Sequence, residues 1–92
     1  MGSDDNILDR IEKTGFEFLL TDLNLAMTMT RIASDSMEDR EKKSRNQENA
    51  RKAYDAVLHL SRKAMLNEHE QGEVNGKLSK LRSALEALGE VF

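Results

Sequence analysis

Cysteine and proline are both absent from this chain of 92 residues, which also holds only five glycines and four aromatic residues. Without cysteine, neither a disulfide framework nor a thiolate metal site can supplement the core. No glycine-rich loop links a strand to a helix, which excludes phosphate binding of the Rossmann or P-loop kind. So few aromatic residues also leave little material for a deep ligand pocket.

Long apolar runs are missing as well, since no stretch approaches the roughly 18 consecutive apolar residues of a membrane span. The N-terminus is acidic where a signal peptide is basic. Gly2 suits N-myristoylation, but Asn6 stands where that motif needs Ser or Thr. We therefore expect a soluble cytoplasmic protein without a membrane partner, in which residues 1–5 are disordered or a cloning remnant.

What the chain does contain favours helices. Charged residues make up 34% of the sequence and alternate with Leu, Ala and Met, which lose little rotamer freedom in a helix. The few β-branched residues never form the alternating pattern of a strand. The sequence predicts an all-α fold with a single domain over residues 1–92. Because so short a chain buries only about 60 to 65% of its unfolded surface, self-association would add to a thin core.

The apolar spacing predicts an antiparallel bundle of three main helices, near 15–34, 46–65 and 68–88, with a short extra N-terminal helical segment. Thr14 and Glu17 fit a capping box, so the first main helix is expected to restart there, with Gly15 marking a bend. The stretch 35–46 has almost no apolar residue and is expected to be a charged loop or frayed helix. The second helix is expected to begin between residues 38 and 46.

The first main helix is apolar over more than half of its circumference. Such a helix is either central to a bundle or covered by a second subunit, because large exposed apolar patches are rare on monomers. Both readings stay open on the sequence alone. The interface candidates are Phe16, Phe18, Leu20, Met27 and Met29.

Local signals define the other two helices. Small residues such as Ala50 and Ala53 line one face of the second helix. Asn67 is a natural N-cap directly after it, so the last two helices are expected to be antiparallel neighbours. Leucines recur every three or four residues in the last helix, which is the pattern of a packing seam. Gly89 is placed to end this helix, and the last two residues then fold back over its end or dock on another chain.

The segment Ala50-Arg51-Lys52-Ala53-Tyr54-Asp55-Ala56-Val57 resembles the second helix of a tetratricopeptide repeat. Its small, aromatic and small positions correspond to Ala50, Tyr54 and Val57. The remaining positions of the repeat fall at Met37, Glu38, Glu41 and Arg62, which do not match. The resemblance therefore implies packing like that of a helical hairpin, without membership of the family.

Groups that carry chemistry are sparse. No serine lies in a nucleophile turn, and the chain has no thiol. His69 and Glu73 could reach one cation from a helix face, but a metal site needs a third ligand, and His59 has no marked spacing to them. We expect no enzyme activity, no metal site and no cofactor.

Charge is unevenly distributed along the chain. Residues 1–39 carry three Lys/Arg against nine Asp/Glu, residues 40–63 carry eight against three, and residues 64–92 carry three against five. The middle segment contains a basic face that could follow a phosphate backbone. This face consists of Arg40, Lys42, Lys43, Arg45, Arg51 and Lys52.

Two functions follow from these patterns. The leading hypothesis is a protein-interaction or self-assembly module, with a second copy or another helical protein as its partner. The alternative is a nucleic-acid-binding or regulatory module that uses the basic face. Glu41 and Glu48 interrupt that face, no aromatic residue is interleaved for base stacking, and the net charge is −3, so a nucleic-acid partner is the less favoured reading.

Overall fold

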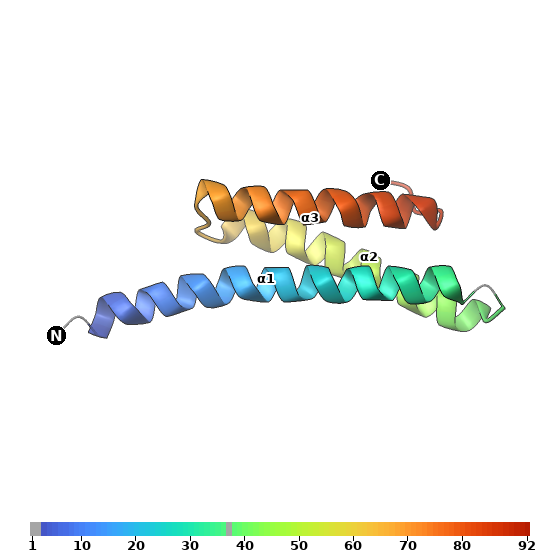
Figure 1. Ribbon diagram of the computed structural model, residues 1–92, viewed down its shortest axis with the longest axis horizontal. Helices are drawn as coiled ribbons and strands as arrows, with labels where there is room; N and C mark the ends of the chain where they lie inside the picture. The colour runs from blue at the N-terminus through green and yellow to red at the C-terminus, as the bar shows by residue number, and fades with distance from the viewer. Residues whose placement is uncertain (1–2, 37) are drawn as a thin grey trace.

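Three α-helices form the described part of the chain, residues 3–36 and 38–92, in a computed structural model (Figure 1). Helix α1 spans Ser3–Asp35, α2 spans Arg40–Lys63 and α3 spans Glu68–Ala87. Side chains are described from Gly15 onward, except that of Met37. No strand occurs in these ranges, which confirms the prediction of an all-α bundle of three main helices.

Each helix runs antiparallel to the next, because the connections between them are short (Figure 1). Each helix packs against both of the others, and the contact between α1 and α2 is the most extensive. The bundle measures 59 × 20 × 16 Å. Within the described ranges, no helix is both long enough and apolar enough to cross a membrane.

Helix α1 is continuous through Gly15, so the predicted restart and bend do not occur there. A helical glycine costs only about 1 kcal/mol relative to alanine, and Leu19 and Leu23 are buried in the next turns. The predicted N-terminal helical segment belongs to the same helix, and its side chains lie outside the described residues. Of the segment 1–5, expected to be disordered or a cloning remnant, Met1 and Gly2 also lie outside them.

Helix α2 begins at Arg40, within the predicted boundary but earlier than the expected helix near 46–65. The predicted charged loop or frayed helix over 35–46 is therefore largely helical. Asp39 explains the early start, because its carboxylate accepts a hydrogen bond from the backbone nitrogen of Lys42 at 3.0 Å. One turn later, the Asn46 side chain donates to the Lys42 carbonyl at 2.8 Å. The helix starts on polar contacts, before any side chain is buried.

The core lies where one stripe from each helix meets. Leu23, Val57 and Leu81 are fully buried and represent α1, α2 and α3. The predicted seam of α3 is confirmed, with only Leu88 partly exposed. Its buried members are Val74, Leu78, Leu81 and Leu85, and the other helices add Leu19, Leu23, Ala26, Ala50, Tyr54 and Val57.

Both ends of α3 are closed by the residues that the sequence indicated. Asn67 and Glu70 form a reciprocal capping box, with bonds of 2.8 and 3.1 Å. Gly89 has a φ of +102°, a conformation that a residue with a Cβ rarely adopts. The backbone nitrogens of Gly89 and Glu90 then bond to the carbonyls of Glu86 and Leu85, both at 3.0 Å. This turn directs the last residues back toward α2.

Candidate interaction surfaces

The structure separates the five interface candidates on α1. Phe18 is 55% exposed, whereas the other four are partly buried and pack against the core. Those four are Phe16, Leu20, Met27 and Met29. The wide apolar stripe therefore serves mostly to contact α2 and α3 within the chain, and of the five candidates only Phe18 projects from it. The sequence could not make this distinction, because both readings need a wide stripe.

Phe18 belongs to a group of exposed apolar side chains that we term the apolar strip, consisting of Phe18, Leu25 and Leu60. Leu25 is 51% exposed and follows Phe18 by two helical turns on the same face of α1. Leu60 of α2 is 41% exposed and lines, with Phe18, a hollow of about 370 Å³ between the two helices. The other lining residues are Gly15, Leu19, Lys63 and Ala64. The strip thus spans α1 and α2 and has a depression beside its largest side chain.

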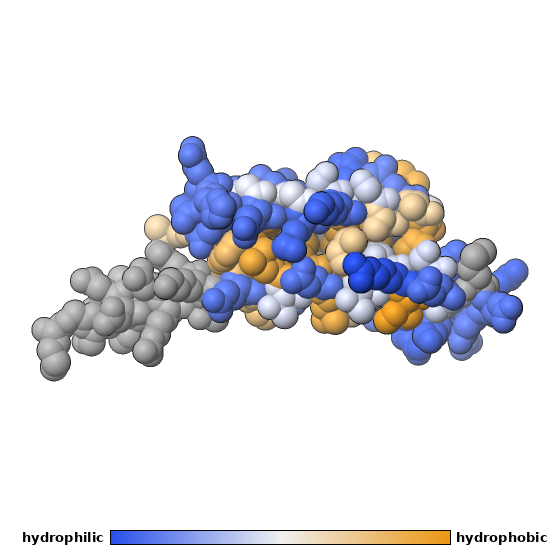
Figure 2. Space-filling view, in the orientation of Figure 1, coloured by the Kyte–Doolittle hydropathy of each residue, from blue (hydrophilic) through white to orange (hydrophobic). Residues whose placement is uncertain are grey.

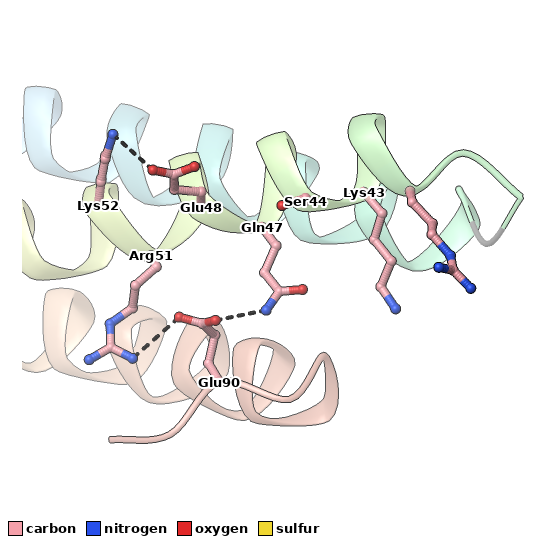
Figure 3. A pocket seen from close by; sticks show the side chains of 8 residues that line it. Lys43, Ser44, Gln47, Glu48, Arg51, Lys52 and Glu90 are labelled. Carbon is pink, nitrogen blue, oxygen red and sulfur yellow. Dashed lines mark hydrogen bonds and ion pairs between the residues drawn. The ribbon is translucent and has the colours of Figure 1, made fainter.

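A second surface feature is a hollow of about 580 Å³ between α2 and the end of α3, which we term the basic hollow (Figure 3). Its lining residues are Arg40, Lys43, Ser44, Gln47, Glu48, Arg51, Lys52 and Glu90. All except the last come from α2, where their three- and four-residue spacing brings them to one side of the helix. Four members of the predicted basic face are therefore brought together. The other two are not, because Lys42 lines a separate hollow at the α1–α2 connection and Arg45 is exposed elsewhere.

Two carboxylates partly neutralise the basic hollow (Figure 3). Glu48 pairs with Lys52 at 3.3 Å, one turn along α2. Glu90 accepts a hydrogen bond from Gln47 Nε2 at 2.7 Å and faces Arg51 Nη1 at 3.5 Å. Glu90 was not among the residues predicted for this face, although the glycine before it indicated a turn that returns the chain to the bundle.

The remaining cations of the basic hollow are Arg40 and Lys43. Among the described residues, neither forms an ion pair. The Lys43 side chain extends on the same side of α2 as the Gln47 amide (Figure 3). The hollow therefore keeps two positive charges at the start of α2, while its carboxylate Glu90 contacts Gln47 and Arg51 farther along the helix.

The C-terminal tail confirms the expectation that the last residues fold back. The ring of Phe92 packs edge-on against Tyr54, with centroids 5.0 Å apart and an interplanar angle of 69°. The guanidinium carbons of Arg51 and Arg82 lie 3.9 and 5.0 Å from the centroid of the same ring. Arg51 Nη1 also donates to the Val91 carbonyl at 2.9 Å. Arg51 thus contacts the side chains of Glu90 and Phe92 and the backbone carbonyl of Val91 between them.

A second cationic hollow, of about 360 Å³, lies between α1 and α3 and includes Arg31, Lys77 and Lys80. Lys77 Nζ donates to Asn24 Oδ1 at 3.0 Å across the two helices. In the space-filling view, hydrophobic side chains lie in the groove between α1 and α3, with hydrophilic side chains on both borders (Figure 2). Unlike the basic hollow, this one has no carboxylate among its lining residues.

No group of three or more His, Cys, Asp or Glu side chains able to hold a metal ion occurs in the described part of the chain. His69 Nε2 lies 3.6 Å from Glu73 Oε1, so the two side chains that the sequence singled out do meet. The His69 side chain is 84% exposed, and His59 is also exposed, on α2. This pair is consistent with a solvated first turn of α3.

The fold is thus that of a small antiparallel bundle of three helices, with an apolar strip and two cationic hollows on its surface. No protein-family model matches the chain, and no curated protein or solved structure matches it at a significant level. The resemblance of residues 50–57 to a tetratricopeptide-repeat helix is accordingly not accompanied by a family match. Function has to be argued from the surfaces themselves.

Proposed function

We propose that this chain is a non-enzymatic interaction module that associates with a second copy of itself through the apolar strip. The observation that carries the proposal is the exposure of Phe18, Leu25 and Leu60, three large apolar side chains at 55%, 51% and 41%. Burying apolar surface yields about 25 cal/mol per Å². A bundle of this size gains much from covering such a strip, because its own core is thin.

Geometry supports a second copy as the partner. The strip lies on two antiparallel helices, so a two-fold axis would place α1 of one copy against α2 of the other and bury the same residues twice. The resulting arrangement of four packed helices is a common bundle. The hollow of about 370 Å³ beside Phe18 offers room for an apolar side chain of the partner.

Charge supports the same arrangement. Helix α1 carries seven Asp/Glu against three Lys/Arg, and α2 carries eight Lys/Arg against three Asp/Glu. At the strip itself, Glu17 is exposed next to Phe18, and Lys63 lines the adjoining hollow. Pairing α1 with the partner's α2 would place opposite charges around the apolar centre, which favours that register.

The test is the solution mass, measured by light scattering over a concentration series. We expect the wild type to dimerise and Phe18→Glu to stay monomeric with its helicity retained, because Phe18 is outside the core. Thr28→Glu is the matched control, since Thr28 is exposed on the side of α1 that lines the α1–α3 hollow. A wild-type chain that stays monomeric at every concentration, or a control as disruptive as Phe18→Glu, would contradict the proposal.

Two further predictions from the sequence, the location of the protein and its binding of nucleic acid, belong to this proposal. A cytoplasmic location rests on composition alone. Nucleic-acid binding through the basic face is favoured by the four cations in one hollow and disfavoured by the two carboxylates among them. Such binding would weaken steeply as the salt concentration rises.

A further inference from the structure

The basic hollow already holds one peptide carboxylate, and this is the starting point of the inference. Glu90 reaches it from a tail of irregular backbone, accepts a hydrogen bond from Gln47 and faces Arg51 (Figure 3). Hydrogen bonds to an ionised acceptor are shorter and stronger than neutral ones, as the 2.7 Å bond from Gln47 illustrates. We infer that the basic hollow binds an acidic peptide segment of a partner protein, and that Glu90 is its internal occupant.

The hollow extends beyond the position that Glu90 fills. Arg40 and Lys43 line it toward the start of α2, with the Ser44 hydroxyl between them and Gln47. From Arg40 to Gln47 the helix rises about 10 Å, at 1.5 Å per residue. An extended peptide covers that distance in about three residues. A segment with two acidic side chains at such a separation would therefore reach both the Gln47 amide and the cations at the start of α2.

The contacts of the tail favour a peptide over a nucleic acid. Arg51 donates to a backbone carbonyl at 2.9 Å and lies 3.9 Å from the ring of Phe92, so it recognises peptide main chain and side chains together. Glu48 and Glu90 within the hollow would repel a backbone with one phosphate at every nucleotide. A peptide avoids this repulsion, because its carboxylates are spaced and neutral residues can lie beside both glutamates.

This site is separate from the apolar strip. On α2, Arg40 and Lys43 lie 20 and 17 residues from Leu60, about 30 and 25 Å of helix. Even Lys52, the lining residue of α2 nearest to Leu60, lies eight residues from it, about 12 Å. The inference therefore does not rest on self-association. The Phe18→Glu variant should bind an acidic peptide as the wild type does, so failure of one proposal leaves the other intact.

The experiment measures fluorescence anisotropy of the labelled peptide Gln-Glu-Gln-Gln-Glu-Gln, whose two glutamates are three residues apart, at low ionic strength, with labelled hexaglutamine as the neutral probe. We expect the Arg40→Gln/Lys43→Gln double variant to lose about five-fold or more in affinity, and each single variant to lose part of that. Glu90→Gln should gain about three-fold, because the internal competitor loses its charge. Circular dichroism and the melting temperature verify that each variant is folded.

The second cationic hollow supplies a charge-matched control. Arg31→Gln/Lys80→Gln removes the same charge from the α1–α3 hollow and should leave the affinity for the acidic peptide within about two-fold. An equal loss there would mean that net charge alone attracts the probe and would overturn the inference. So would a Glu90→Gln variant with unchanged affinity. Tighter binding of a single-stranded oligonucleotide that depends on Arg40 and Lys43 would replace the peptide with nucleic acid.

Discussion

The two halves of α2 reach the same helical conformation by different means. From Arg40 to Asn49 no side chain is buried, whereas the half from Ala50 to Lys63 buries four. The buried residues are Ala50, Tyr54, Val57 and Ser61. The first half depends on the Asp39 cap and local polar contacts, and the second on the core. Because the first half buries no side chain, one whole side of it is available to a partner, and five of the seven α2 residues that line the basic hollow lie in this half.

The largest expected loss of stability comes from a substitution in the packed half of α2. Val57→Ala removes two methyl groups from a fully buried site and should lower the free energy of unfolding by about 2 kcal/mol. Asn49→Ala, in the unpacked half, should change it by less than about 0.5 kcal/mol. Urea denaturation at one fixed protein concentration measures both, since dimerisation makes stability depend on concentration. Equal losses of unfolding free energy in Val57→Ala and Asn49→Ala would contradict the difference between the packed and the unpacked half of α2.

The C-terminal tail should contribute the next largest effect, where it meets the packed half of α2. Phe92→Ala removes the edge-on contact with Tyr54 and the stacking of Arg51 and Arg82, and should cost about 1 to 2 kcal/mol. Val91→Ala is the control, because Val91 is 85% exposed and its carbonyl bond to Arg51 survives the change. Similar unfolding curves for the two variants would show that the tail does not add to stability.

The smallest effect should arise at the cap of the unpacked half. Asp39→Ala removes the acceptor for the Lys42 amide and should cost about 1 kcal/mol. The loss should be local, with faster amide hydrogen exchange in the first two turns of α2 and unchanged exchange from Ala50 onward. Asn67→Ala, at the start of α3, is the comparison variant. Its cap precedes a helix that buries side chains from the second turn onward, whereas α2 buries none before Ala50. Uniformly faster exchange along α2 after Asp39→Ala would refute the division into two halves.

How much of this fold the sequence could predict differs between its helices. For α3, the seam, the Asn67 cap and the Gly89 turn were all predicted, because each is a local signal read within a few residues. For α2, the start was placed late because apolar residues were given more weight than capping. Continuity of α1 through Gly15 was missed for a related reason, since burial in the following turns outweighs the cost of one glycine.

The candidate surfaces were harder to predict, because exposure depends on how the helices are placed around one another. The spacing puts Phe16 and Phe18 on different faces of α1, but only the placement of α2 and α3 decides that Phe16 packs against the core and Phe18 is exposed. The basic face was recognised as a run of charges, but its division into paired and unpaired cations was not. Glu90 meets Gln47 across 43 residues of sequence, and no local pattern indicates such a contact.

The short connections between antiparallel helices also bear on how the chain reaches its native state. Most contacts in such a topology join residues close in sequence, and proteins of this kind fold within microseconds to milliseconds. Proline isomerisation, which takes tens of seconds, has no place here because the chain contains no proline. No slow isomerisation step therefore separates the unfolded chain from the native bundle.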